Sequence, residues 1–283
     1  MVEILKSGLY DTIQDLGRPS YQQFGVPLSG VMDVYSASLA NALVSNGNDA
    51  AVVECMMTGP KLKFHNDALI CITGAKMQAK LNDVFIANNT AIIIKSGDIL
   101  SFGRLELGCR TYIAIAGGFR SELIMGSRSM YQDLTNDHKL KTGDRIPVSE
   151  EKIAIPSSFA SVKTKNNYFK TKQIQVIKGP EFESLSLEQQ RSLFENEFTI
   201  SSDSNRMAYQ FDERFENQLQ SMITSLVLPG TVQLTPNGQL FVLMKDCQTT
   251  GGYPRVLQVI ESSIGKLSQK LSGDKIQFKC IAL

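Results

Sequence analysis

The 283-residue chain is longer than one average domain and suits two, with enough material to bury a core in each. Hydrophobic residues make up 42% and charged residues 20%, as in an ordinary soluble globular protein. The 29 basic and 28 acidic side chains give a net charge of +1, which argues against partners recruited by a global field, such as nucleic acid or a membrane surface. Residues 1–20 lack a signal sequence, and no apolar run approaches the roughly 20 residues of a membrane span, so we expect a cytoplasmic protein.

Cysteine and histidine usage excludes several kinds of site. The five cysteines are an odd number, widely spaced and without a C-x-x-C pair, so neither a metal centre nor a disulfide framework is expected. Only His65 and His138 could activate a serine or cysteine nucleophile, which disfavours that chemistry. The sequence contains no P-loop, no Gly-x-Gly-x-x-Gly motif, no zinc-ligand spacing and no biotin-acceptor lysine between two methionines.

The segment from Tyr10 to Asp33 follows a short predicted strand over 2–5 and combines turn formers with functional groups. Its candidate site residues are Gln14, Asp15, Arg18, Ser29 and Asp33. Asp33 is the natural N-cap of a helix predicted over 34–44. For this carboxylate, capping and catalysis both stay open.

Strand signals dominate from Val52 onward. The predicted strands are Val52–Met56, Ala68–Thr73, Ala91–Lys95, Ile99–Phe102 and Thr111–Ala116. Short strands at this spacing, parted by glycine, asparagine and proline, favour a barrel or a sandwich. A Ser/Thr-Gly-Asp turn before a strand recurs three times, at 96–98, 142–144 and 272–274, which hints at related barrel units in the two halves.

A change of composition divides the chain. Residues 151–172 are rich in serine, lysine and asparagine and predict a linker or mobile loop between an N-terminal β-rich unit, 1–150, and a C-terminal barrel unit, 173–283. The second unit opens with a strand over 174–177. A helix over 187–195 follows, with the capping box of Ser186 and Gln189. Next come a strand over 198–201 and a polar loop, 201–210, whose candidate site residues are Arg206 and Tyr209.

The most polar stretch between two buried strands is KDCQTTGGYPR, residues 245–255. A hairpin of strands over 231–234 and 240–244 precedes it, and strands over 256–260 and 275–280 follow. The candidate site residues in this loop are Asp246, Gln248, Thr249, Thr250, Gly251, Gly252, Tyr253 and Arg255. We expect the glycine pair to adopt positive φ and present N–H groups to an anion, with the Arg255 fork suited to a carboxylate or phosphate. A long turn with a surface arginine is the alternative. Cys247 is expected to be a small buried filler.

Several segments together resemble the family that includes allophanate hydrolase subunit 2, biotin-dependent carboxyltransferase-like proteins and the C subunit of 5-oxoprolinase. The segments are TIQDLGR (12–18), GVPLSGVMD (25–33), LANALVSN (39–46), TGP (58–60), TGA (73–75), AGGF (116–119), GSRS (126–129), SDSNRMAY (202–209) and DCQTTGGYPR (246–255). The resemblance implies a mainly β fold with a few helices, arranged as two linked cyclophilin-like barrel units. It also implies a smaller partner protein of related fold.

The function that this resemblance implies is ATP-dependent hydrolysis of 5-oxo-L-proline to L-glutamate, shared with the smaller, KipI-like B subunit of 5-oxoprolinase and with its A subunit. Opening a lactam needs hydrogen-bond donors around the negative charge that develops on its oxygen, and the candidates for this role are Arg18, Arg206, Arg255, Gly251 and Gly252. It also needs carboxylates that hold the metal-nucleotide or direct water, and the candidates are Asp15, Asp33 and Asp246. The substrate-binding set is Gln14, Ser29, Arg206, Tyr209, Gln248, Thr249, Thr250, Gly251, Gly252 and Tyr253. ATP, with Mg²⁺, is the expected cofactor, held here or on the partner, and no biotin is attached to this chain. We expect the three arginine-bearing turns to meet at one site.

Two alternatives belong to other functional classes. The first is carboxyl transfer in a biotin-dependent urea or amide carboxylase system, which would need a separate biotin carrier. The second is a regulatory binding protein that opposes its partner's inhibition of a sensor histidine kinase, as the family name KipA implies.

Overall fold

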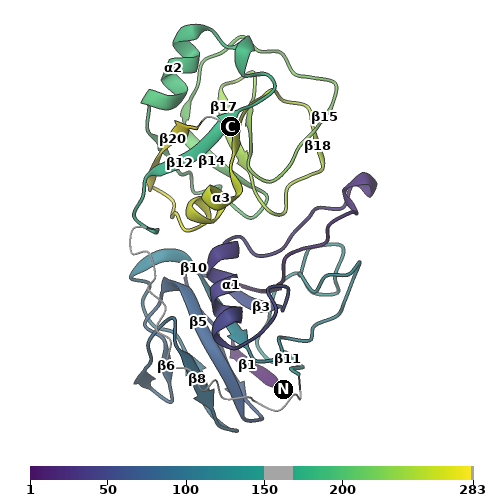
Figure 1. Ribbon diagram of the computed structural model, residues 1–283, viewed down its shortest axis with the longest axis vertical. Helices are drawn as coiled ribbons and strands as arrows, with labels where there is room; N and C mark the ends of the chain where they lie inside the picture. Colours follow the sequence, from purple (N-terminus) through teal and green to yellow (C-terminus); the bar gives the residue numbers. More distant parts are fainter. Residues whose placement is uncertain (150–167, 282–283) are drawn as a thin grey trace. The chain divides into compact units, whose positions relative to one another are not determined.

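The computed structural model describes residues 1–149 and 168–281 (Figure 1). The chain forms two compact units, one of Met1–Arg18 with Ser29–Lys165, the other of Pro19–Leu28 with Asn166–Leu283. The sequence predicts that all of residues 1–150 belong to the first unit. In the structure, the segment Pro19–Leu28, which contains the 3-10 helix η1 (Gln22–Phe24), groups with the second unit instead. Of the predicted linker, 151–172, residues 151–167 lie outside the described part of the chain.

Two antiparallel sheets build the first unit. The six-stranded sheet has the order β11-β1-β4-β9-β6-β7 and the five-stranded sheet the order β2-β3-β10-β5-β8. The strands of the first are β1 (Val2–Lys6), β4 (Lys61–Phe64), β6 (Lys80–Leu81), β7 (Val84–Phe85), β9 (Ile99–Ser101) and β11 (Arg145–Ile146). Those of the second are β2 (Tyr10–Gln14), β3 (Val52–Met56), β5 (Ala68–Lys76), β8 (Ala91–Ile94) and β10 (Leu107–Ile115).

Apolar side chains fill both faces of the five-stranded sheet. One core joins it to the six-stranded sheet, with Phe64 and Ile113 among the fully buried members. A smaller core joins its other face to α1 (Val34–Leu43), which lies beside β3, β5 and β10 in Figure 1. The α1 helix begins as expected, because the Asp33 carboxylate accepts the N–H of Ser36 at 3.1 Å.

The second unit is one seven-stranded sheet that nearly closes into a barrel. Its order is β13-β20-β12-β19-β16-β17-β14, and a bridge between Ile200 and Phe211 connects its two edges. The strands are β12 (Gln173–Lys178), β13 (Phe198–Thr199), β14 (Ala208–Arg214), β16 (Thr231–Leu234), β17 (Gln239–Leu243), β19 (Arg255–Val259) and β20 (Lys275–Cys280). All neighbouring strands pair antiparallel, except that β12 and β20 pair parallel with each other. A separate ribbon pairs β15 (Ser225–Leu226) with β18 (Thr250–Gly251).

Aromatic residues fill the barrel. The rings of Phe198, Phe211 and Phe278 lie 5.4–5.8 Å apart, centre to centre, and all three side chains are buried. The remaining helical segments are η2 (Phe182–Ser184), α2 (Leu187–Glu195) and α3 (Glu261–Ser268). The predicted capping box at the start of α2 is present, with Ser186 and Gln189 each accepting the other's backbone N–H. The mainly β class with a few helices and a barrel-shaped sheet is therefore confirmed.

Several elements lie where the sequence predicts none, and for three of them the physical reason is clear. β2 (Tyr10–Gln14) buries the polar residues Asp11, Thr12 and Gln14, so it lacks the alternation that marks a half-exposed strand. β14 (Ala208–Arg214) begins inside the predicted polar loop, because only Tyr209 and Phe211 are buried, and two apolar residues are too short an alternation to mark a strand. α3 (Glu261–Ser268) has no capping side chain and contains Gly265. Among residues 1–149 and 168–281, no helix has both the length and the apolar character that crossing a bilayer requires.

Asp11 is a buried acid within this fold. It is 1% exposed, and its Oδ2 accepts the N–H of Gly8 at 2.5 Å. Burial raises the pKa of Asp11 to about 6, against the opposing effect of the Gly8 hydrogen bond. Folded protein therefore holds this proton at a pH where the unfolded chain has released it.

We expect the free energy of unfolding to contain an Asp11 contribution that is complete below about pH 4 and lost as the pH rises through about 6, a fall of about 3 kcal/mol. Asp11→Asn should remove this fall and be the more stable protein at neutral pH. Urea unfolding of both proteins between about pH 4 and 8 measures the difference and cancels the other carboxylates. A difference that stays constant over that range would contradict the expectation.

Candidate functional site

The carboxylate of Asp15, at the end of β2, holds the GSRS turn. It accepts hydrogen bonds from the hydroxyls of Ser127 at 2.6 Å and Ser129 at 2.7 Å, and from the backbone N–H groups of Gly17 at 2.8 Å and Arg128 at 2.6 Å. Oδ1 accepts three of these hydrogen bonds and Oδ2 accepts one. In this structure Asp15 joins two turns, and neither serine was among the predicted site residues.

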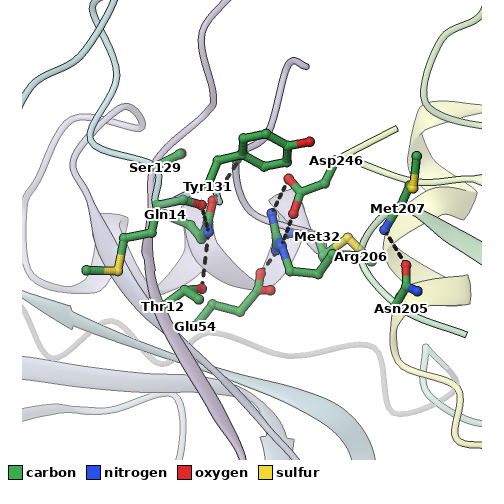
Figure 2. A network of polar contacts seen from close by, with 12 residues as sticks. Thr12, Gln14, Met32, Glu54, Ser129, Tyr131, Asn205, Arg206, Met207 and Asp246 are labelled. Atoms are coloured by element: carbon green, nitrogen blue, oxygen red, sulfur yellow. Dashed lines mark hydrogen bonds and ion pairs between the residues drawn. The ribbon is translucent and has the colours of Figure 1, made fainter. Parts of the chain in front are cut away.

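Gln14 and Arg18 belong to the same cluster. The Gln14 amide donates to Thr12 Oγ1 at 3.1 Å (Figure 2). It also donates to the carbonyl of Met130 at 3.1 Å, and its Oε1 accepts the N–H of Gly30 at 3.1 Å. Arg18 is fully buried, and its Nη2 donates to the carbonyl of Ser129. Both predicted residues therefore fix the turns at this end of the five-stranded sheet.

Ser29 and Gly30 form the adjoining turn. Both have positive φ, 56° at Ser29 and 91° at Gly30. A Cβ on Gly30 would lie 2.8 Å from the nitrogen of Gly17, so only glycine allows this close approach. The Ser29 hydroxyl is fully buried and has no hydrogen-bond partner within residues 1–149 and 168–281, and such a group commonly marks the place of a water or ligand.

A buried network of hydrogen bonds holds the backbone of Asp33 in place. The Tyr112 hydroxyl accepts the N–H of Asp33 at 2.8 Å and donates to Glu54 Oε2 at 2.9 Å, while that same oxygen accepts the N–H of Met32 at 2.8 Å. Arg110 Nε lies 3.6 Å from Glu54 Oε1. Burial, and then the charges of Glu54 and Asp33, raise the pKa of Tyr112 well above its ordinary value.

Glu54, Arg110 and Tyr112 were not among the predicted site residues, although a signal was present. Glu54 and Arg110 are charged residues inside strands that are otherwise apolar, and buried charges at such positions are rarely without a partner. Both oxygens of Asp33 bind Ser36, at 3.1 Å to its N–H and 2.7 Å to its hydroxyl. The capping role of Asp33 is confirmed, and its catalytic role stays a prediction.

In the second unit, Arg206 and Asp246 form a buried bidentate ion pair. Arg206 Nε lies 2.7 Å from Asp246 Oδ2, and Arg206 Nη2 lies 3.1 Å from Asp246 Oδ1 (Figure 2). The backbone N–H of Asp246 also donates to the Arg206 carbonyl at 2.9 Å. Tyr209, on β14, is buried, and its hydroxyl lies 3.3 Å from the carbonyl of Ser268. Two predicted site loops are thus joined.

Arg255 is engaged elsewhere in the barrel. Its Nε and Nη2 bind the two oxygens of Glu181, at 3.0 and 2.8 Å, and its Nη1 donates to the carbonyl of Leu226 at 3.0 Å. The hydrogen bonds from Arg255 to the Glu181 carboxylate lower the pKa of Glu181. The guanidinium therefore ties β19 to the η2 turn and to β15, and its catalytic role stays a prediction.

The two ion pairs lie at opposite ends of the barrel sheet. β17 and β19 run in the same direction, because each pairs antiparallel with β16 between them. Asp246 follows the carboxyl end of β17, whereas Arg255 begins β19. The expected meeting of Arg206 with Arg255 is therefore not found. Arg18 belongs to the other unit.

The glycine pair was expected to adopt positive φ, and this is wrong. Neither Gly251 nor Gly252 is in the left-handed region. Thr250 and Gly251 form β18, and a Cβ on Gly251 would lie 2.6 Å from Gln233 Nε2. That amide donates to the carbonyl of Tyr253 at 3.1 Å, so the missing side chain makes room for a loop-closing hydrogen bond.

The remaining residues of this loop differ in exposure. Gln248 and Thr249 are half-buried, and Thr250 and Tyr253 are exposed. The carbonyl of Thr249 accepts the N–H of Val227 at 3.1 Å. Cys247 is buried, and burial, then the Asp246 charge, raises the pKa of its thiol to about 12. The thiol is therefore protonated at neutral pH, which agrees with the expected packing role.

A cavity of about 390 Å³ opens beside Asp15 within the first unit. Its walls are four turns, namely 15–17, 45–51, 117–120 and 123–128, of which those at 15–17, 117–120 and 123–128 carry residues of the QDLGR, AGGF and GSRS segments. Its volume lies within the range of about 300–1,000 Å³ that is common for small-molecule sites. It is therefore a candidate site in the described part of this unit.

These features define a class, a mainly β protein of two units in which polar, ion-paired turns join the ends of barrel and sheet strands. The family model described as carboxyltransferase domain, subdomain A and B, matches residues 24–280, and the chain belongs to this family. It is 32% identical to the C subunit of 5-oxoprolinase from Escherichia coli (strain K12), over 98% of this chain and 90% of the relative. It is 30% identical to the C subunit of 5-oxoprolinase from Haemophilus influenzae, over 100% and 92%.

Solved structures of larger enzymes contain the same fold. The urea amidolyase of K. lactis superposes with a TM-score of 0.90 at 28% identity, over 99% of this chain and 19% of that one. The Kluyveromyces lactis urea carboxylase gives a TM-score of 0.89 at 28% identity, over 99% and 27%. This chain therefore spans less than a third of either enzyme.

Proposed function

We propose that this protein is the C subunit of an ATP-dependent 5-oxoprolinase, which hydrolyses 5-oxo-L-proline to L-glutamate. The observation that carries the proposal is its similarity to two proteins that bear the name of this 5-oxoprolinase component, over nearly the full length of each. The cavity beside Asp15 supports it, because its volume suits a small lactam. The reaction class is hydrolysis of a cyclic amide within a complex.

The partners in this proposal are the A subunit and the smaller B subunit of 5-oxoprolinase. Their presence is supported by the names of both relatives, which designate one component of a larger enzyme. We assign the catalytic step to the assembly, because the carboxylates proposed for it on this chain already have donors. Asp15 binds four, Asp33 binds Ser36, and Asp246 binds Arg206.

ATP and Mg²⁺ are assigned to the partner proteins for the same reason. Mg²⁺ that accompanies a nucleotide is usually held by one or two carboxylates together with the phosphates. Asp15, Asp33 and Asp246 do not fit that role while their oxygens are engaged, and no three His, Cys, Asp or Glu side chains form a metal cluster in residues 1–149 and 168–281. ATP supplies the driving force for opening the lactam.

Reconstitution from separately purified proteins tests the proposal. We expect glutamate formation from 5-oxoproline and ATP only when this chain is present together with the A and B subunits. Heat-denatured chain is the control for carry-over of other proteins. Full glutamate formation without the chain would remove it from the reaction.

Carboxyl transfer is a second candidate, favoured by the family match and by the urea amidolyase similarity. The chain is 39% identical over 160 residues to the urea amidolyase of Lachancea kluyveri, which covers 9% of that protein. This function needs a biotin carrier on another chain. Inhibition of the reaction by avidin would favour carboxyl transfer, whereas insensitivity to avidin would favour direct hydrolysis.

A further inference from the structure

Hydrogen bonds connect the walls of the cavity beside Asp15. Asp15 joins the 15–17 turn to the 123–128 turn through Gly17, Ser127 and the N–H of Arg128. On the opposite side, the Asn46 amide donates to the carbonyl of Ile115 and accepts the N–H of Gly117, each at 2.8 Å. These bonds connect the four turns pairwise, so the cavity is already formed without a ligand, which reduces the cost of binding.

The charged side chains in the cavity wall differ in how freely they can bind a ligand. Asp15, Asp49, Arg120 and Arg128 supply the charged side chains of the lining. The Asp15 carboxylate accepts four hydrogen bonds, three at Oδ1 and one at Oδ2, and Asp49 is exposed to solvent. Hydrogen-bond donors around a carboxylate offset part of its negative charge, so Asp15 repels an incoming anion less than a bare carboxylate would.

The two arginines keep donors for a ligand. Arg128 Nη1 donates to the carbonyl of Ser121, and in residues 1–149 and 168–281 no ion pair involves Arg120 or Arg128. Each guanidinium has five N–H groups arranged in a planar fork that matches the two oxygens of a carboxylate. Gly17, Gly118 and Gly126 leave space in the adjoining walls because they lack side chains.

We infer that this cavity is a carboxylate-binding site, in which Arg120 and Arg128 bind the carboxylate of 5-oxo-L-proline. The inference rests on the proposed function. It adds that the protein recognises the carboxylate of the substrate, and that Arg120 and Arg128 bind it. A second cavity of about 340 Å³ is also lined by Arg120 and Arg128. We place the ligand in the first because glycine turns form its walls and the hydrogen-bonded turns fix its shape.

Isothermal titration of the full chain tests the assignment, with 5-oxo-L-proline, with 2-pyrrolidinone, which is the same lactam without a carboxylate, and with Mg²⁺-ATP. We expect binding of 5-oxo-L-proline and no detectable binding of 2-pyrrolidinone. Arg120→Gln and Arg128→Gln should each weaken binding on the order of 10- to 100-fold, as loss of a hydrogen bond to a charged group does. Arg104→Gln is the matched control, because Arg104 is exposed and lines neither cavity.

Thermal unfolding shows whether each variant is folded. Arg120→Gln is the cleaner variant because, unlike Arg128→Gln, it does not remove the hydrogen bond to Ser121. Equal binding of 2-pyrrolidinone, unchanged affinity in both variants, or no binding of 5-oxo-L-proline by the chain alone and in the complex would each overturn the inference. So would binding of Mg²⁺-ATP that both variants weaken, with 5-oxo-L-proline unaffected. Turnover by the reconstituted complex separates the two proposals, since it can persist when the arginine assignment fails.

Discussion

Asp246→Ala is expected to destabilise the barrel unit by about 3–5 kcal/mol. Arg206 and Asp246 have side chains only 7% and 10% exposed, and two hydrogen bonds join them. Removing one member of a buried ion pair leaves the other charge in a site that water hardly reaches, and the cost is typically of this size. The loss should be visible as a lower midpoint of urea unfolding for the second unit.

Two controls separate the loss of this ion pair from general damage. Lys95→Ala removes an exposed ion pair with Asp67, in which the two side chains are 70% and 51% exposed, and should change stability little. The double variant Arg206→Met, Asp246→Leu replaces the pair with apolar groups and should recover much of the loss. A single Asp246→Ala variant as stable as the parent protein would show that the pair contributes nothing.

The second large effect is expected at Asp15. Asp15→Asn keeps the shape of the side chain but replaces one carboxylate oxygen with an N–H₂ group. This group would face N–H and O–H donors that bind the carboxylate in the parent protein. Hydrogen bonds to charged groups contribute about 1.5–3 kcal/mol each, and the losses are not additive, so we expect a destabilisation of at least about 3 kcal/mol. The same change should loosen the cavity and weaken binding of 5-oxo-L-proline.

Asp49→Asn is the matched control for Asp15, because Asp49 lines the same cavity but is exposed. It should leave stability nearly unchanged. Ser129→Ala should reproduce part of the Asp15→Asn effect, since the Ser129 hydroxyl both donates to Asp15 Oδ1 and accepts the Asp15 N–H. If Asp15→Asn and Asp49→Asn have equal stability, the hydrogen bonds of Asp15 do not hold the turns together.

Much of the fold follows from local sequence signals. The strand Val52–Met56 and the strand Lys275–Cys280 have the predicted bounds, because apolar or alternating runs are bounded there by turn residues. The same holds for the caps at Asp33 and Ser186, where the signal extends over only three residues. These features depend on near neighbours, which a sequence displays directly.

The candidate site was predictable only in part. Asp15, Gln14 and Arg18 were correctly associated, because they lie in one turn. Ser129, which binds Asp15, is 114 positions away, and Glu181 lies 74 positions before Arg255. Which carboxylate an arginine finds over such separations depends on strand order and register, and a single sequence does not display either.

The wrong prediction of positive φ at Gly251 has a similar origin. Two consecutive glycines indicate freedom of the backbone, and positive φ is the commonest use of it. Here the structure uses the absence of a Cβ, because the Gln233 side chain fills the space. The distinction depends on a residue from β16, which pairs with β19 beyond the loop.

Phosphate release from ATP by the complex of this chain with the A and B subunits of 5-oxoprolinase is the sharpest test of the proposed function, with 5-oxo-L-proline compared against urea plus bicarbonate. We predict release that depends on both the chain and 5-oxo-L-proline, accompanied by glutamate formation in proportion to the ATP consumed. Release that depends on the chain but requires urea and bicarbonate, with 5-oxo-L-proline inactive, would contradict the proposal.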